Sequence, residues 1–415
     1  MTQEPKIFPY IERLLEGEEV VWKPLGEVAE LKRGTTITKK TSNEGIYPVI
    51  SGGQQPAYYI DQFNRDGETI TVAGSGAYAG FVMYWNEPIF VGDAFSVKAD
   101  EKQVLPRFIY HFLLSIQEKI HDLKSGGGVP HVYAKDVARF VIPLPPLSVQ
   151  QEIVRILDKF TELEAELEAE LDCRKRQYDY YRNHLLSYEG NEVEWKTLGE
   201  VACFQNGKGH EQSIDENGAF IVVNSKFIST DGGIKKYCDE QIVPLFKDDI
   251  LIVMSDLPNG KALAKTFLVK ENNKYTLNQR IGRITIKDTS KLLSIFVNYY
   301  INRTRQLTKY DNGIDQTNLK KDQILSVQIP LPPLEEQQRI ANILDKFNTL
   351  VNSISEGLPR EIELRKKQYE YYREQLLTFP SSLRATPTSS LRGEAIHTSK
   401  ADSEAPRQTK TDALP

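Results

Sequence analysis

The same order of sequence motifs occurs twice in this chain of 415 residues, and that duplication constrains the fold more than any other feature. A closing motif, Ile-Pro-Leu-Pro-Pro-Leu, spans residues 142–147 and returns at 329–334. An opening motif, Trp-Lys-x-Leu-Gly-Glu-Val, spans residues 22–28 and returns at 195–201. Between the two motifs the copies share almost no sequence. Each copy therefore has constant ends and a divergent globular body.

The likeness resumes in the segment after each closing motif. Ile-Leu-Asp-Lys-Phe ends at Phe160 and again at Phe347, and Arg-Lys-(Arg/Lys)-Gln-Tyr ends at Tyr178 and Tyr369. Apolar residues recur here at steps of three or four, which predicts helices with one apolar stripe each. The first stripe comprises Ile153, Ile156, Phe160, Leu163, Leu167, Leu171, Tyr178, Tyr181 and Leu185, and the second Ile340, Ile343, Phe347, Leu350, Ile354, Ile362, Tyr369, Tyr372 and Leu376.

A helix of about 40 residues is roughly 60 Å long, which is too long to pack only on its own domain. Since each helix has one stripe, we expect the two to pair antiparallel as a coiled coil. Packing on two separate partners is the alternative. We expect Ser148 to cap the first helix and Gly190 to end it. Gly357 and Pro359 should interrupt the second helix, with Pro359 in the first turn of a new segment.

The bodies show short β-rich runs punctuated by glycine, with helical periodicity late in each. The expected strands are 45–50, 68–73, 80–84, 220–223, 250–253 and 282–286, and the expected helical stretches are 106–123 and 292–307. This pattern predicts an α+β (mixed α/β) class, with two globular domains separated by a long antiparallel two-helix coiled coil and related by pseudo-two-fold symmetry.

We expect six segments along the chain. They are an N-terminal segment (1–19), a first domain (20–147), a first helix (148–190), a second domain (191–334), a second helix (335–379) and a tail (380–415). The tail is rich in Ser, Thr and Pro and has no apolar period, so we expect it to be disordered and dispensable to the fold.

Loops between the expected strands are rich in groups that contact bases and phosphates. Asn and Gln pair with adenine, and Arg and Lys with guanine. The candidate DNA-binding residues are Lys32, Arg33, Thr35, Lys39, Lys40, Ser51, Gln54, Gln55 and Ser75 in the first body, and Gln205, Asn206, Lys208, His210, Asn224, Lys226, Lys261, Asn278, Gln279, Arg280, Gln316 and Asn318 in the second. The same residue types are common in ordinary solvated loops. The net charge of −5 argues against general coating of DNA, so any contact must be local.

No route to catalysis is visible in the sequence. There is no phosphate-binding loop, no dinucleotide fingerprint, no amino-methyltransferase motif and no paired-carboxylate or Ser/His/Asp arrangement. Three widely spaced cysteines and six histidines make no metal-ligand pattern, and they favour a reducing cytoplasm. No run approaches the roughly 20 apolar residues of a membrane-spanning helix. We therefore expect neither catalytic residues, nor a metal, nor a membrane contact.

The closing motifs, the Gln-Gln and Ile-Leu-Asp-Lys-Phe helix starts and the Arg-Lys-(Arg/Lys)-Gln-Tyr-x-Tyr-Tyr-Arg helix ends resemble the conserved regions of Type I restriction–modification specificity (S) subunits. The opening motifs look like the starts of their target recognition domains. The resemblance covers about residues 10–379 and occurs twice.

This resemblance implies two target recognition domains, each binding one half of a bipartite, asymmetric site in double-stranded DNA. It implies two modification (methyltransferase) subunits, which carry S-adenosylmethionine and methylate adenine, and restriction subunits, which supply ATP- and Mg-dependent translocation and cleavage. The chain itself would hold no cofactor. Two other functions are compatible with the residues: a duplicated DNA-binding regulator that acts alone, and a coiled-coil scaffold with no DNA role.

Overall fold

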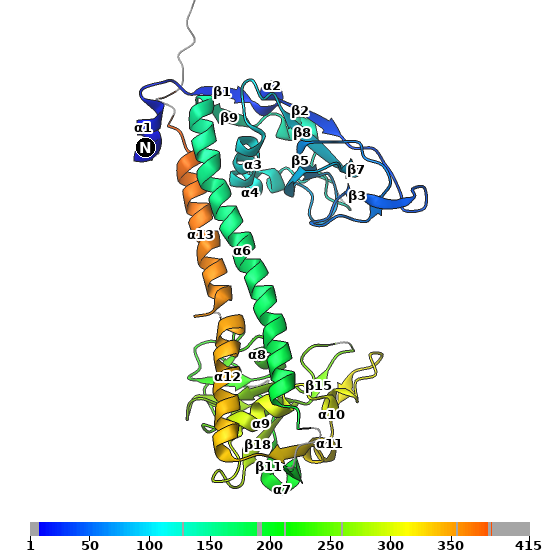
Figure 1. Cartoon of the computed structure of the whole chain (residues 1–415), viewed down its shortest axis with the longest axis vertical. Helices are drawn as coiled ribbons and strands as arrows, with labels where there is room; N and C mark the ends of the chain where they lie inside the picture. Colours follow the sequence, from blue (N-terminus) through cyan, green and yellow to red (C-terminus); the bar gives the residue numbers. More distant parts are fainter. Residues whose placement is uncertain are drawn as a thin grey trace, which may run out of the picture. The chain divides into compact units, whose positions relative to one another are not determined.

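The computed structural model describes residues 8–126, 128–188, 193–210, 213–258, 260–353, 356–380 and 383. The chain divides into two units, Met1–Arg155 with Arg373–Pro415 and Ile156–Tyr372. Figure 1 draws the elements of both, and each unit is described by itself. The expected helix end at Gly190, the stripe residue Ile354 and most of the tail lie outside the described residues.

The first body has a four-stranded antiparallel sheet beside a three-stranded one. The larger sheet has the order β2 (Ala29–Arg33), β8 (Ala94–Ala99), β5 (Glu68–Ala73) and β6 (Val82–Asn86). The smaller has the order β4 (Tyr59–Ile60), β3 (Glu44–Ile50) and β7 (Phe90–Val91), with β3 and β7 parallel. The helical stretch expected at 106–123 is two helices, α3 (Pro106–Ser115) and α4 (Gln117–Asp122).

The second body repeats this topology strand for strand, although its sequence is almost unrelated. Its larger sheet has the order β11 (Ala202–Asn206), β18 (Ile281–Ile286), β14 (Ile250–Val253) and β16 (Thr266–Leu268). Its smaller sheet has the order β13 (Tyr237–Cys238), β12 (Phe220–Val223) and β17 (Tyr275–Leu277), with β12 and β17 parallel. Helices α8 (Ser225–Ser229), α9 (Ser294–Ile301) and α10 (Arg305–Thr308) complete it, with a short pair of strands, β15 (Ser255–Asp256) and β19 (Thr317–Asn318).

Strand β14 shows why the second body packs in layers. Its alternate side chains point to opposite faces, as in any strand. Ile250 and Ile252 join the core cluster that includes α9 and the helix after the closing motif, whereas Leu251 and Val253 join the cluster under the smaller sheet. Both faces are therefore buried, which explains an uninterrupted apolar run. The mixed class of two bodies with long helices, expected from the sequence, is confirmed.

The opening and closing motifs are partner strands. Strand β1 (Val21–Pro24) pairs antiparallel with β9 (Val141–Leu144), and β10 (Glu194–Thr197) pairs antiparallel with β20 (Gln328–Leu331). The register is the same in both copies, with Trp22 opposite Pro143 and Trp195 opposite Pro330. Since proline lacks an N–H, these short two-stranded sheets are a place where it is tolerated. The shared motifs thus close the base of each body.

Short helices accompany the two-stranded sheets in each unit. They are α1 (Pro9–Leu15), α2 (Leu25–Val28) and α5 (Ala134–Val137) in the first unit, and α7 (Leu198–Val201) and α11 (Lys321–Leu325) in the second. Helix α1 is held by Ile11 and Leu15, which are buried, and by the Tyr10 hydroxyl, which donates to Glu152 at 2.6 Å. Bonds from Arg155 and Tyr10 lower the pKa of the Glu152 carboxyl to about 2.

A buried glutamine joins each long helix to its body. Gln150 is fully buried, donates to the carbonyls of Gln103 and Pro145, and accepts the Leu105 N–H. Gln337 is equally buried and makes the same three bonds, to the carbonyls of Lys291 and Pro332 and from the Leu293 N–H, at 2.8 to 2.9 Å. Each glutamine therefore ties the closing motif and the loop before α3 or α9 to one helix turn.

The first long helix, α6, runs from Leu147 to Leu185, and the second is split into α12 (Leu334–Asn352) and α13 (Leu358–Leu377). Ser148 therefore lies inside the first turn of α6 and is not its N-cap, because the helix already begins after Pro146. The expected interruption is present, and Pro359 lies in the first turn of α13, where a proline costs no hydrogen bond.

Within the second unit, α6 runs alongside α12 and α13 (Figure 1). Phe160 stacks on Tyr372 with ring centroids 5.2 Å apart, and Tyr181 stacks on Phe347 at 5.5 Å. Lys366 forms ion pairs with Glu164 and Glu168 at 3.3 and 2.9 Å. Early residues of α6 thus meet late residues of the second helix, so the two run antiparallel.

Several stripe residues contribute to burial beyond the helix pair. Tyr178, Leu185 and Ile340 pack on the core of the second body, and Leu344 is buried there in place of Ile343. Ile153 and Leu376 are buried within the first unit. Leu350 is exposed, and the stacked Tyr181 keeps 42% of its surface exposed. The remaining members are Ile156, Leu163, Leu167 and Leu171, which are half-buried, and Ile362 and Tyr369, which are buried. Each stripe therefore packs partly on a globular body and partly against the other long helix.

The structural role of the buried Gln337 can be tested against its exposed neighbour Gln338. Gln337→Leu keeps the side-chain size but leaves the Leu293 N–H without its acceptor, so we expect the free energy of unfolding to fall by about 1–3 kcal/mol. Gln338→Leu, on the exposed neighbour, should change it by less than about 0.5 kcal/mol. Denaturant titration measures both. Equal losses in the two variants would contradict the structural role of Gln337.

Candidate nucleic-acid interface

Strand direction brings the candidate loops of the first body together. Strands β2 and β5 run parallel to each other on either side of the antiparallel β8, so the loops after Arg33 and Ala73 lie beside the turn that precedes Ala94. The Gly34 N–H donates to the Ala94 carbonyl at 2.9 Å, and the Gly74 N–H donates to the Asp93 carbonyl at 3.1 Å. These loops form one side of the sheet, which we name the first loop edge (residues 33–35, 51–55, 74–76 and 92–93).

The smaller sheet adds its loop to the same edge. The Gly92 N–H donates to the Ile50 carbonyl at 2.8 Å, which places the 51–55 loop beside Gly92. A Cβ on Gly52 would lie 2.4 Å from the Ser75 carbonyl oxygen, so only glycine permits this approach. Arg33, Thr35, Gln54 and Gln55 are exposed there, and Ser51 and Ser75 are half-buried. Lys32 is exposed on β2, and Lys39 and Lys40 are exposed in a turn further along the loop.

The second body builds an equivalent edge from different residues. The Gly207 N–H donates to the Ile281 carbonyl at 3.1 Å, the Asn278 N–H to the Val223 carbonyl at 3.2 Å, and the Met254 N–H to the Arg280 carbonyl at 2.9 Å. These bonds join the loops after β11, β12, β14 and β17. We name this side the second loop edge (residues 205–208, 224, 254–256, 278–280 and 316–318).

Most of the candidates of the second body lie on this edge. Gln205, Asn206, Lys208, Gln279, Arg280, Gln316 and Asn318 are exposed, and Asn278 is half-buried. A Cβ on Gly207 would lie 1.9 Å from the Asn278 carbonyl oxygen, so this crossing also requires glycine. Lys226 on α8 and Lys261 are exposed as well, and the loop of Lys261 meets the edge where the Ala262 N–H donates to the Asp256 carboxylate at 2.7 Å. The edge therefore gathers amide and cationic side chains from four loops.

His210 is a wrong prediction. It is 1% exposed, and its ring nitrogens each lie 2.9 Å from an oxygen, Nδ1 from the Lys208 carbonyl and Nε2 from the Thr276 hydroxyl. A buried polar ring is held by its partners and has no atom to offer to DNA. Asn224 is also structural in part, since its Oδ1 accepts the Phe227 N–H and caps α8.

Sequence reasoning missed a buried ion pair beneath the second loop edge. Asp249 is 2% exposed and lies 2.8 Å from Arg283 Nε, and its other oxygen accepts the Thr285 hydroxyl. Arg283 also donates to Gln205 at 3.3 Å, so the pair positions an amide on the edge. Arg283 lies on β18 and Asp249 directly precedes β14, and no local pattern in the sequence identifies them as partners.

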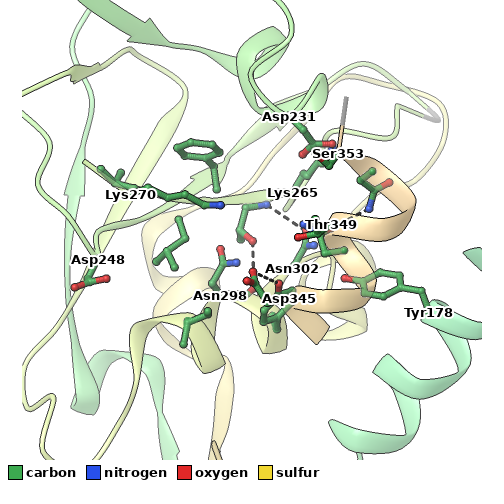
Figure 2. A pocket seen from close by; sticks show the side chains of 18 of the residues that line it. Tyr178, Asp231, Asp248, Lys265, Lys270, Asn298, Asn302, Asp345, Thr349 and Ser353 are labelled. Atoms are coloured by element: carbon green, nitrogen blue, oxygen red, sulfur yellow. Dashed lines mark hydrogen bonds and ion pairs between the residues drawn. The ribbon is translucent and has the colours of Figure 1, made fainter. Parts of the chain in front are cut away.

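A cavity of about 750 Å³ lies along the outer strand β16, against α9 and α12. Figure 2 shows Asn298, Asn302 and Asp345 close together on one wall, with Tyr178 of α6 at the margin. Lys265 is paired with Asp231 at 3.1 Å, and the Tyr299 hydroxyl donates to Asp345 at 3.1 Å. Burial, followed by the charge of Asp345, raises the pKa of Tyr299. The cavity contains none of the candidate DNA-binding residues, and its lining includes charges of both signs.

Two features are absent from the described part of the chain. No group of three His, Cys, Asp or Glu side chains in that part of the chain could hold a metal ion. No helix in it is long and apolar enough to span a bilayer.

The two bodies have one topology and the same kind of two-stranded sheet, and each presents a polar loop edge that differs from the other in sequence. This arrangement defines a class of duplicated recognition proteins. The family model described as the Type I restriction modification DNA specificity domain matches residues 17–172 and 191–364. The chain therefore belongs to the Type I restriction–modification specificity subunits, which are non-catalytic components of multisubunit enzymes.

Individual relatives agree with this assignment. The chain is 33% identical over 409 residues to the specificity subunit of the Escherichia coli EcoR124I/EcoR124II Type I restriction enzyme, covering 89% of this chain and 97% of that one. It is 32% identical over 402 residues to a Haemophilus influenzae chain assigned to the same class, covering 89% and 98%. A crystal structure of a Type I S subunit from M. genitalium has the same fold, with a TM-score of 0.60 at 19% identity over 87% of this chain and 97% of that one.

The contrast between two neighbouring residues tests the assignment of the second edge. His210→Ala removes both ring contacts, so the free energy of unfolding should fall by about 1–3 kcal/mol. Lys208→Ala, on the exposed edge, should change it by less than about 0.5 kcal/mol. Thermal or denaturant unfolding measures the difference. If His210→Ala had no effect on stability, the buried role of this ring would be wrong.

Proposed function

We propose that this chain is the DNA-reading subunit of a Type I restriction–modification complex, and that each loop edge reads one half of a bipartite, asymmetric site. The observation that carries the proposal is the contrast between the two halves. The two halves agree in the two-stranded sheets of the opening and closing motifs, in the topology of the larger sheets and in the helix junctions. The residues on the two loop edges, in contrast, differ in type and charge at equivalent places. Divergence confined to one edge of a retained framework is what two readers of different sequences need.

The chemistry of the edges supports DNA as the ligand. Exposed amides such as Asn206 and Gln279 suit the donor and acceptor pattern of adenine, and exposed cations such as Arg33 and Lys208 suit guanine or phosphate. The cations are few and local, in keeping with the net charge of −5. Phosphate contacts would make the affinity fall with salt.

In this proposal the helix pair fixes the spacing of the two half-sites and offers two docking surfaces to modification subunits. Those subunits carry S-adenosylmethionine and methylate adenine, and restriction subunits join through them with ATP and Mg. The helix ends repeat one motif, in which Tyr180 and Tyr371 are exposed at 65% and 56%, so two copies of the same partner can be met by similar surfaces. Exposed aromatic side chains are frequent anchors of protein interfaces.

Co-expression with the modification subunit of the same system tests the proposal. We expect a stable complex of this chain with two modification subunits, salt-dependent binding to DNA, and adenine methylation at a motif made of two defined halves with an undefined spacer. A stand-alone regulator would instead bind a site tightly without any partner. A scaffold would show no salt-dependent DNA binding. Either outcome would overturn the proposal.

A further inference from the structure

One position on the loop edges carries opposite charges in the two bodies. Asp93 comes directly before Ala94, the first residue of β8, and its carbonyl accepts the Gly74 N–H. Arg280 comes directly before Ile281, the first residue of β18, and its carbonyl accepts the Met254 N–H. Gly74 and Met254 each follow the last residue of the equivalent strand, β5 or β14. Asp93 and Arg280 therefore occupy the same place in the shared topology.

The surroundings of this position also correspond. Ser75 follows Gly74 and Ser255 follows Met254, so each edge has a serine hydroxyl beside the position. The Ser75 hydroxyl donates to the Asp93 carboxylate. In the second body the Ser255 hydroxyl instead accepts from Gln316 at 2.8 Å. Among the described residues, the Arg280 guanidinium has no hydrogen-bond or ion-pair partner, and the side chain is exposed.

The backbone at Arg280 is held against its local preference. Its φ is +67°, in the left-handed region that glycine and asparagine adopt more readily than arginine. The second body has one residue more than the first in this turn, since Gly92 and Asn278 occupy the same place after β7 and β17. The Gln279 N–H donates to the Lys208 carbonyl at 2.9 Å, and the Ile281 carbonyl accepts the Gly207 N–H at 3.1 Å, so the backbone is held on both sides of Arg280. Residues with such φ values cluster at active sites and ligand clamps in proteins, and in this chain they also occur elsewhere, as at Asp231 and Ala264.

We propose that this position reads a base in each half-site, with Arg280 reading a guanine and Asp93 the amino group of a cytosine. Arginine pairs two-fold with O6 and N7 of guanine in the major groove, and aspartate accepts from N4 of cytosine. The inference rests on the DNA-reading function proposed above. It goes further by naming the position, and the change in charge, that separates the two specificities.

The test uses the intact complex with its modification subunits and a set of DNA sites in which every base pair of both halves is substituted in turn. Arg280→Asn removes the cation and suits the left-handed backbone. With the wild-type chain, we expect a preference for guanine of about ten- to a hundredfold at one base pair of one half-site. In Arg280→Asn this preference should fall below about threefold. Preferences at all other base pairs should persist. Arg280→Lys, which keeps the charge but not the planar fork, should lose most of the same preference.

Lys270→Asn is the matched control, because it removes the same charge from an exposed residue. Lys270 follows β16 at the end of the sheet that is away from the second loop edge. This variant should leave the whole profile unchanged. Asp93→Asn should lower the preference for cytosine at one base pair of the other half-site.

Two results would overturn the inference while leaving the proposed function intact. If Arg280→Asn weakened binding evenly at every substituted site, the residue would contact phosphate and not a base. If the profile of Arg280→Asn matched that of the unmodified complex, the position would have no reading role. A complex without any base preference in its unmodified form would overturn the proposed function as well.

Discussion

In each globular body, two parallel strands flank one antiparallel strand in the larger sheet, and this arrangement decides which loops meet. The chain leaves β2 and β5, or β11 and β14, at the same side of the sheet at which it enters β8 or β18. Backbone hydrogen bonds then join the loops to one another, and glycine at residues 52 and 207 allows the crossings. The exposed side chains on these loops, such as Arg33 and Lys208, can change without cost to the sheets, because they take no part in the core.

The constant parts of the chain have a different physical role. The opening and closing motifs pair as two-stranded sheets in one register, and Gln150 and Gln337 connect those sheets to the long helices through three buried hydrogen bonds each. A substitution there leaves a buried polar group without a partner, which is costly. The likeness between the two copies is therefore concentrated where substitution would damage the junction, and it is lost where substitution changes only the surface.

This division explains what the sequence could predict. The repeat, the helix stripes and the interruption at Pro359 were readable because they depend on local periodicity and on the backbone of proline. The shared topology of the two bodies was not readable, because strand pairing such as β5 with β8 depends on contacts between distant residues and the body sequences have diverged. His210 was misassigned because a glycine-rich loop resembles an exposed one. The ring is in fact buried against Thr276, which lies 66 residues away. The pairing of Arg283 with Asp249 was not readable either, because the two residues lie far apart in the sequence.

If two independent reading edges are built on one framework, one edge can be exchanged without altering the other. Exchanging residues 20–147 for the corresponding body of another specificity subunit, and mapping the methylated adenines made by the assembled complex, tests this independence most directly. We expect one half of the recognition site to change while the other half and the spacer stay the same. A change in both halves, or in neither, would contradict the independence of the two edges.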